Sequence, residues 1–434
     1  MADRETEIDD AQRLVAGNGW KNPSEKARRE GVSRREFMKE SGLASLAATG
    51  GAGALSGCIG GGGDGNGSGD GGGGGDPTAQ VGYIPITDAS PLLTAYANGH
   101  FEDNGVEAEE PELFRGWSEL AEAFFGGSVN IAHFLMPMTV WMRYNLEENV
   151  QVVAWDHTDG SALTVRDGIE DWSDLGGGRV AVPFWYSIHN VVLQMGLRRE
   201  GLTPLLDETN PSDDEVALVV QPPPDMPASL ANGNTDGYIV AEPFNAIGEL
   251  ESGGNILRFT GDVWKQHACC VVVMREDTLE NNPEWSRSVM DSIVDAQSWI
   301  RGNREDAATL LSQDGSGLLD YPQNQINRAM NHYDLEEYGP EQGNGAIQHT
   351  EWENERIGFY PYPYRSYTEE LVRKLKETEV EGEAAFLEDV EPDFAADDLV
   401  SYEPVRSSLE AAGGPSEFGV EEENGYERQE TIEF

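Results

Sequence analysis

Cationic side chains that could hold an anion are scarce in this chain. Only three lysines follow residue 58, and two of them, Lys374 and Lys376, belong to a charged helical pattern with an exposed character. Lys265 instead stands alone beside a tryptophan and a histidine. An ammonium group partly withdrawn from water binds an anion through a charge-assisted hydrogen bond. Lys265 is therefore a candidate anion ligand, and an ordinary surface salt bridge is the alternative.

Backbone amides at the start of a helix offer a second means of binding an anion, because free N–H groups and a partial positive charge meet there. Two strand-to-helix turns are candidates: Asp88–Ser90, and Ser187–Asn190, which also carries His189. Simple helix capping by Ser90 and Asn190 is an equally good interpretation. Capping and ligand binding can also coexist.

A scaffold of more than one core must position these residues. The chain has 434 residues, which suits two α/β lobes. Short apolar strands alternate with helical patterns, which predicts α/β architecture. Ser90 is the expected N-cap of the first helix, with Pro91 at its first position. The expected strands are 81–86, 129–132, 150–155, 163–165, 180–184, 216–220, 237–240 and 270–274, and the expected helices are 90–99, 118–125, 138–144, 190–200, 226–231, 283–302 and 304–312.

A glycine-rich turn at Gly176–Gly178 precedes a buried strand, and we expect the chain to enter its second lobe there. The return is expected near residue 262. The predicted organisation is an export signal (1–57), a tether (58–77), a first lobe (78–176), a second lobe (177–262), a return to the first lobe with C-terminal helices (263–385) and an acidic C-terminal extension (386–434).

The first 57 residues have the features of a cleaved export signal. Arg34 and Arg35 lie in a stretch that resembles the twin-arginine export motif. A short apolar segment, Leu43–Leu55, follows and is too short to span a bilayer. It ends at Cys58, in a sequence that looks like a lipobox. We therefore expect a lipoprotein on the extracellular face of the membrane, anchored through Cys58 and held on a flexible Gly/Asp-rich tether.

The charge of the chain is extreme and unevenly placed. The formal net charge is −50; residues 1–57 are neutral, and the remainder holds 20 of the 29 basic and 70 of the 79 acidic residues. Such a body repels nucleic acid and anionic headgroups. Disorder is the alternative to adaptation, but 38% hydrophobic residues and ten tryptophans argue against it. We interpret the charge as adaptation to high salt, typical of a halophilic archaeon.

Enzyme chemistry finds little support in the sequence. The chain carries no Gly-rich phosphate loop and no nucleophile motif. Cys269 and Cys270 are adjacent, which is a strained arrangement for a disulfide, so we interpret them as strand residues. No metal-type cysteine spacing occurs. We expect no catalytic residue, no metal and no cofactor.

Five sequence blocks occur in order between about residues 81 and 280: GYIPITDASPLLTAYANGHFEDNGVE, VNIAHFLMPMTVWM, GGRVAVPFWYSIHNVVLQMGLRREGL, VALVVQPPPDMPASLANGNTDGYIVAEPFNA and GDVWKQH. These blocks resemble the nitrate/sulfonate/bicarbonate class of ABC solute-binding proteins, most closely its nitrate- and bicarbonate-binding members. The resemblance implies a two-lobed periplasmic-binding fold of type II with an interlobe cleft, together with a separate permease and ATPase.

The resemblance also implies roles for individual residues. Lys265 corresponds to a lysine that meets the anion, His189 to a pocket histidine, and Trp117 to a tryptophan that lines the cleft. Other expected site residues are Ser118, whose amide lies beside Trp117, Met136 on the wall, Glu242 as a residue that orients a helix end or the lysine, and His157 in a stretch facing the hinge, along with Asp88, Ser90 and Asn190. Core packing is an equally good interpretation of Met136.

The expected function is capture of a small anion in the cleft and its delivery to the permease. The alternative solutes are a thiamine-precursor pyrimidine, taurine or another sulfonate, and bicarbonate with Ca²⁺. Aromatic residues around 155 and 184–186 would favour a flat ring or an organic sulfonate over nitrate. A secreted enzyme on the same fold is a further, weaker alternative.

Overall fold

The computed structural model describes residues 76–206, 210–332, 334–353, 355–420 and 426–434. The chain divides into two units, Met1–Asp76 and Pro77–Phe434. The expected export signal, the lipidation site Cys58 and most of the tether lie outside the described residues. Among the described helices, none has the length and apolar character needed to cross a membrane.

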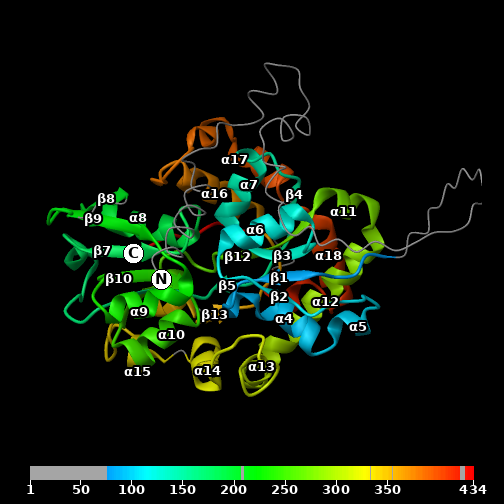
Figure 1. Ribbon diagram of the computed structural model, residues 1–434, viewed down its shortest axis with the longest axis horizontal. Helices are drawn as coiled ribbons and strands as arrows, with labels where there is room; N and C mark the ends of the chain where they lie inside the picture. The colour runs from blue at the N-terminus through cyan, green and yellow to red at the C-terminus, as the bar shows by residue number, and fades with distance from the viewer. Residues whose placement is uncertain (1–75, 207–209, 333, 354, 421–425) are drawn as a thin grey trace, which may run out of the picture. The chain divides into compact units, whose positions relative to one another are not determined.

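Two β-sheets organise the unit Pro77–Phe434. The first has five strands in the order β2-β1-β3-β12-β4 (Figure 1). β1 is parallel to β2 and β3, whereas β12 runs antiparallel to β3 and β4. The returning strand thus lies in the middle of the sheet. The strands are β1 (Val81–Tyr83), β2 (Glu112–Leu113), β3 (Ile131–Leu135), β4 (Val150–Trp155) and β12 (Cys270–Arg275).

The second sheet has six strands in the order β11-β6-β10-β7-β9-β8. Its β6 is antiparallel to β10 and β11, and the strands from β10 to β8 are parallel. Helices α8, α9 and α10 pack beside it, as the left half of Figure 1 shows. The strands are β6 (Ser161–Val165), β7 (Arg179–Val182), β8 (Thr203–Leu206), β9 (Glu215–Val220), β10 (Gly237–Ala241) and β11 (Asn255–Phe259).

The crossing into the second lobe lies earlier than the sequence predicted. Because β6 pairs with β10 and β11, the change of sheet occurs before Ser161 and not at residue 177. The glycines at 176–178 have another cause: a Cβ on Gly176 would lie 2.1 Å from the carbonyl oxygen of Asp213. The chain returns to the first sheet between β11 and β12, and the expected residue, 262, lies within that connection.

The crossing segment is itself paired. Its short strand β5 (Thr158–Asp159) runs antiparallel to β13 (Ile357–Gly358). The backbone of Asp159 has a φ of 59°, in the left-handed region. A Cβ on Gly261, in the returning connection, would lie 2.6 Å from the Asp159 carboxyl carbon. Both connections between the lobes therefore pack closely against each other.

Helices cover the sheets and complete the core. The 20-residue α12 packs against α4, α5 and α18 over the first sheet. The 3-10 turn η2 (Thr87–Ala89) runs directly into α4. Ser90 was expected to be the N-cap of that helix, but it is the first helical residue. The α-helices are α4 (Ser90–Ala97), α5 (His100–Asp103), α6 (Trp117–Gly126), α7 (Met136–Tyr144), α8 (Ile188–Arg199), α9 (Met226–Ala231), α10 (Phe244–Ile247), α11 (Glu276–Asn281), α12 (Pro283–Gly302), α13 (Arg304–Leu311), α14 (Gln323–Asn331), α15 (Leu335–Tyr338), α16 (Arg365–Leu375), α17 (Pro392–Asp398) and α18 (Tyr402–Ala411).

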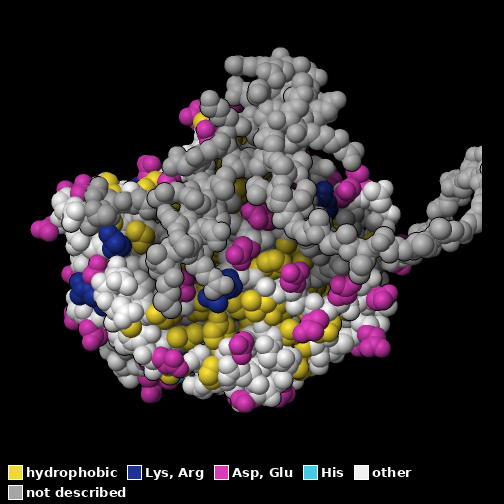
Figure 2. Space-filling model, viewed as in Figure 1, with side chains coloured by type: hydrophobic (Ala, Val, Ile, Leu, Met, Phe, Trp, Pro, Cys, Tyr) yellow, Lys and Arg dark blue, Asp and Glu magenta, His cyan; other side chains and the backbone are white. Residues whose placement is uncertain are grey.

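The described part of the C-terminal stretch 386–434 packs into the first lobe. Val405 and Leu409 of α18 belong to the same buried cluster as α12. Near the end of the chain, the amide of Glu433 donates to the carbonyl of Val263 over 2.9 Å. Its last residue also contacts the second lobe, since the rings of Phe434 and Trp172 have centroids 5.9 Å apart. This stretch is therefore a structural part of the fold. Figure 2 shows acidic side chains spread over the visible face, with basic ones at few places.

Candidate functional site

A group of buried polar side chains lies where the first sheet meets the crossing segments, and we call it the junction cluster. Its members are each at most 2% exposed. They come from both lobes and from both connections. The junction cluster consists of Asp88, His133, Asp156, His157, Ser161, His189, Thr260, His267, Cys269 and Cys270.

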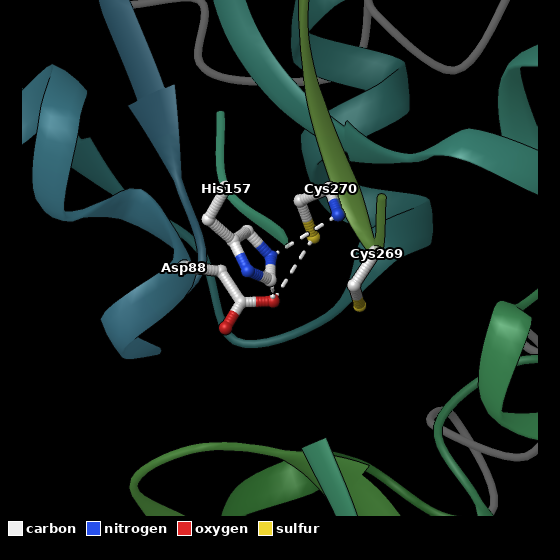
Figure 3. A group of neighbouring side chains, drawn as sticks. All are labelled: Asp88, His157, Cys269 and Cys270. Carbon is white, nitrogen blue, oxygen red and sulfur yellow. Dashed lines mark hydrogen bonds and ion pairs between the residues drawn. The ribbon is translucent and has the colours of Figure 1, made fainter. Parts of the chain in front are cut away.

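Asp88 and His157 form the closest charged contact of the cluster. The Nε2 atom of His157 lies 2.7 Å from Asp88 Oδ2. The Cys270 thiol donates to the same oxygen over 3.3 Å, and the Cys270 amide points at His157 Nε2 over 3.2 Å. Figure 3 shows these three side chains facing one another, with Cys269 alongside. Side chains from the η2 turn, the crossing segment and the returning strand β12 thus contact one another.

His189 connects this group to the second lobe. Its Nε2 lies 2.9 Å from Ser161 Oγ and 3.7 Å from Cys269 Sγ. It stands in the first turn of α8, where Ser187 is the N-cap. A second histidine, His267, lies 2.9 Å from Thr260 Oγ1 through its Nε2, and the same hydroxyl donates to the carbonyl of Ser161. The hydroxyl and imidazole groups therefore form one connected network.

His133 and Trp117 form the wall on the first lobe. His133 accepts a 2.9 Å hydrogen bond from the amide of Ile84 through Nε2, and its Nδ1 lies 3.6 Å from Asp156 Oδ2. The Trp117 ring lies against it, with centroids 5.5 Å apart. Trp117 is the first residue of α6 and is buried. It therefore stands at a helix start that faces the cluster.

Burial sets the ionisation of most of these groups. It raises the pKa of Asp88 to about 6, although the charge of His157 opposes the rise. It raises the pKa of Asp156 well above its ordinary range. It lowers the pKa of His133 to about 3 and that of His267 to about 4. Burial thus favours the protonated form of Asp156 and the neutral form of both histidines.

The remaining groups are governed by their neighbours. Burial lowers the pKa of His157, but the Asp88 carboxylate outweighs it and leaves the pKa well above the ordinary value. Burial raises the pKa of Cys269, yet the hydrogen bond with Cys270 and the charge of His189 bring it well below the ordinary range. Burial and Cys269 together raise the pKa of Cys270. The pKa values of the two adjacent thiols are thus shifted in opposite directions.

Several polar atoms of the cluster and its wall have no hydrogen-bond partner among the described residues. Three belong to residues that the sequence singled out: Trp117 Nε1, His189 Nδ1 and Asp88 Oδ1. Buried polar groups are almost always paired, because an unpaired one costs about 1–3 kcal/mol. A guest bound among them could supply the missing partners.

Other predicted site residues have structural partners. The Ser90 hydroxyl donates to the carbonyl of Thr87, and Asn190 bonds the carbonyls of Trp185 and Glu379. Glu242 Oε2 accepts from the amide of Ala246 at the start of α10.

Glu242 Oε1 pairs with Arg356 over 2.6 Å. This carboxylate orients a helix end, as one of its predicted roles requires, and its cationic partner is an arginine instead of the expected lysine. Met136 begins α7, is buried, and its amide donates to the carbonyl of Cys269. Ser118 is half-buried in the first turn of α6.

Lys265 is not brought to the junction cluster by any contact of the described residues. It is half-exposed, its amide donates to the carbonyl of Thr431, and its Nζ lies 6.0 Å from the centre of the Trp352 ring. The neighbouring residue that does join the cluster is His267. Within the junction cluster, His157 is paired with the carboxylate of Asp88.

Of the ten residues of the cluster, the sequence predicted three as site residues (Asp88, His157 and His189) and missed seven. His133 lies in a wholly buried strand, and a histidine in an apolar strand was the available signal. Ser161 and Thr260 each lie at the edge of a connection between the lobes, a position that the misplaced crossing concealed. Cys269 precedes β12 by one residue, so it does not follow the strand alternation that was assumed for it.

Comparison with known proteins gives this geometry a family. A model described as the NMT1-like family matches residues 72–312, more than half of the chain. The chain belongs to the NMT1-like family. Its relatives include the nitrate/nitrite binding protein NrtA of Nostoc sp. PCC 7120, 26% identical over 65% of this chain and 70% of that protein. The taurine-binding periplasmic protein of Escherichia coli K12 is 28% identical over 49% of this chain and 63% of that one.

The fold of this NMT1-like chain is also shown by a solved structure. The periplasmic nitrate-binding protein NrtA of Synechocystis PCC 6803 superposes with a TM-score of 0.65 at 19% identity, over 79% of this chain and 91% of that one. The predicted two-lobed periplasmic-binding fold is thereby confirmed. The family predicted from the five sequence blocks is confirmed as well, since the relatives are nitrate- and taurine-binding proteins.

Proposed function

We propose that this chain is the solute-binding component of an ABC importer and holds a small anion at the junction cluster. The supporting observation is a pair of buried ring nitrogens, one from each lobe, that have no hydrogen-bond partner among the described residues. Trp117 Nε1 comes from α6 of the first lobe, and His189 Nδ1 comes from α8 of the second. A guest that bonds both would hold the lobes together.

The electrostatics favour an anion in spite of the acidic body. In the metal-free protein the Asp88 carboxylate raises the pKa of His157 against the effect of burial, which favours a positive charge on that ring. Burial raises the pKa of Asp156, which favours the protonated carboxyl, a donor, over an ionised group that would repel the guest. N–H and O–H donors in a site with little water stabilise an anion more strongly than they would at the surface.

Capture would require the lobes to separate and close again. Contacts between them lie around the cluster: the amide of Thr87 donates to the carbonyl of Glu242 over 2.8 Å, and the Trp141 and Tyr186 rings stack with centroids 5.9 Å apart. A solute that bonds both lobes adds to these contacts and shifts the equilibrium toward the closed form. This coupling is how a binding protein would signal its loaded state to a permease.

The compartment and partners complete the proposal. Twin-arginine export, a lipid on Cys58 and the glycine-rich tether would keep the protein on the outer face of the membrane, beside a permease and an ATPase encoded as separate chains. The body would work in high salt, in keeping with its charge of −50. In this role it transports without catalysing a reaction, and no nucleic acid is a partner.

The packing of three aromatic residues supports a small anion over an aromatic solute. Trp155 packs between Tyr364 and Tyr367, and Trp185 donates to Glu381. Tyr186 is stacked on Trp141. These rings are committed to packing, so a small anion fits the remaining unpartnered donors better than a flat ring does.

Calorimetric titration of a Cys58→Ser form, which escapes lipidation, tests the proposal with nitrate, bicarbonate, taurine and hydroxymethylpyrimidine. One of the three solutes that carry an anionic group (nitrate, bicarbonate or the sulfonate of zwitterionic taurine) should bind with the highest affinity. Trp117→Phe and His189→Gln should each weaken its binding by about tenfold or more, the value of one hydrogen bond to a charged group.

Trp285→Phe is the matched control. Trp285 is also buried with an unpartnered Nε1, but it lies in α12, in the hydrophobic core. Its replacement should leave the affinity unchanged. Tightest binding of the pyrimidine, or equal effects of the three substitutions, would contradict the proposal.

A further inference from the structure

Four metal-binding side chains of the junction cluster meet at one point. Asp88, His157, Cys269 and Cys270 each offer one ligand atom, and these atoms all lie within 4.8 Å of one another. All four side chains are fully buried. Figure 3 shows them converging from the η2 turn, the crossing segment and the start of β12.

The chemistry of this quartet matches a soft divalent cation. Zn²⁺ binds thiolate, imidazole and carboxylate ligands in tetrahedral geometry, at about 2.3 Å to sulfur and about 2.0–2.2 Å to nitrogen and oxygen. Such bond lengths place the ligand atoms about 3.3–3.8 Å apart. The present spacing of at most 4.8 Å is therefore close to that of an assembled site.

The quartet also has unsatisfied bonding capacity. Asp88 Oδ1 is buried without a hydrogen-bond partner among the described residues. His157 Nε2 lies 2.7 Å from a carboxylate oxygen, which requires it to donate, and 3.2 Å from the Cys270 amide, which requires it to accept. One nitrogen cannot do both. A cation bound to the lone pair of His157 and to the carboxylate would satisfy the atoms that now conflict.

Groups around the quartet would support the thiolates. His189 Nε2 lies 3.7 Å from Cys269 Sγ, and Ser161 donates to the same sulfur over 3.8 Å. Hydrogen bonds to the ligands of a metal ion typically fix their orientation and their protonation. Both groups belong to or lead into the second lobe, so separation of the lobes would expose the site to an entering ion.

We propose that Asp88, His157, Cys269 and Cys270 form a binding site for one divalent transition-metal ion of the Zn²⁺ class. The adjacent cysteines lack the separated spacing of ordinary zinc motifs, which is why the sequence predicted no metal. The site goes beyond the proposed function, because an ion can be detected there without any solute.

X-ray absorption of the full reduced chain loaded with one equivalent of Zn²⁺ reads the ligands without any substitution. We expect two sulfur neighbours at about 2.3 Å and two nitrogen or oxygen neighbours. The many surface carboxylates can bind Zn²⁺ only through oxygen. A spectrum with oxygen and nitrogen neighbours alone would therefore overturn the proposal.

Titration with Co²⁺ gives an independent reading through the thiolate-to-cobalt absorption band. The band should saturate at one equivalent and disappear on addition of Zn²⁺. Cys269→Ser and Cys270→Ser should each weaken Co²⁺ binding by more than about 100-fold, at least as much as the loss of a supporting residue. Cys58→Ser replaces the remaining cysteine of the chain and should leave the band intact.

Loss of the band in Cys58→Ser, or its survival when both Cys269 and Cys270 are replaced, would also contradict the site. The outcomes are separate from those of the proposed function. Solute binding without any sulfur-bound metal overturns the metal site alone, and a sulfur-bound metal in a protein that binds none of the four solutes overturns the transport proposal alone.

Discussion

Protonation of His267 should destabilise this protein in mild acid, and replacing the residue should remove that effect. His267 is fully buried in the junction cluster, and burial lowers its pKa from 6.5 to about 4. Below pH 6.5 the unfolded chain takes up a proton at this position, whereas the folded chain does not until about pH 4. The stability that the neutral ring contributes is therefore present above pH 6.5 and is lost as the pH falls.

The magnitude follows from the width of that interval. Each unit of pH between 6.5 and about 4 lowers the free energy of unfolding by about 1.4 kcal/mol. The full loss attributable to His267 is therefore about 3 kcal/mol. Asp88, whose pKa is raised to about 6, has the opposite sign, since its protonated form is favoured in the folded state as the pH falls. Only the difference between variant and wild type isolates the histidine.

Urea unfolding of the wild type and of His267→Gln between pH 7 and pH 4 measures this difference. The variant should lose stability at pH 7, because the ring is well packed, and should recover about 3 kcal/mol relative to the wild type by pH 4. Thr260→Val is the matched control: it removes the hydrogen bond to His267 but keeps the ring, so its profile should run nearly parallel to the wild type. A flat difference profile for His267→Gln would refute the reasoning.

Three further outcomes follow from the packing and charge. Arg356→Met should lower the free energy of unfolding in urea by about 3–5 kcal/mol, because it leaves the buried Glu242 carboxylate unpaired. Adding Glu242→Leu should recover most of that loss. A double variant no more stable than the single one would contradict this. Leu409→Ala in α18 should lower the free energy of unfolding by about 2–5 kcal/mol. Leu335→Ala, at a side chain that is 44% exposed, should lower it by less than about 0.5 kcal/mol. Equal losses would mean that the C-terminal stretch is not part of the core. Raising the KCl concentration from about 0.1 M to about 1 M shortens the electrostatic screening length from about 10 Å to about 3 Å. Because the protein is so acidic, this should weaken the repulsion between its charges and raise its Tm. An unchanged or lower Tm would argue against salt adaptation.

The alternation of strands and helices was predictable because it depends on local apolar periodicity. The turns at Asp88 and His189 could be located for the same reason, since each follows the end of a predicted strand. Trp117 and His157 were reached through the family resemblance and not through periodicity. The structure brings Asp88, His157 and His189 into one buried cluster and sets Trp117 against His133 in its wall.

The surroundings of Lys265 and the position of the lobe crossing depended on contacts between segments that are distant in sequence. The partners of Lys265 are Thr431 and Trp352, which lie far along the chain in sequence, so its isolation among acidic residues could not indicate where it points. The crossing was misplaced because Gly176 is required by a close backbone contact with Asp213, a cause that no local pattern distinguishes from a lobe boundary.

A crystal structure with the tightest-binding anion of the solute panel tests the central claim most directly. The anion should lie within hydrogen-bond distance of His189 Nδ1 and Trp117 Nε1, enclosed between the two sheets. An anion bound at the outer surface, or one that leaves both of these atoms without a partner, would contradict the account.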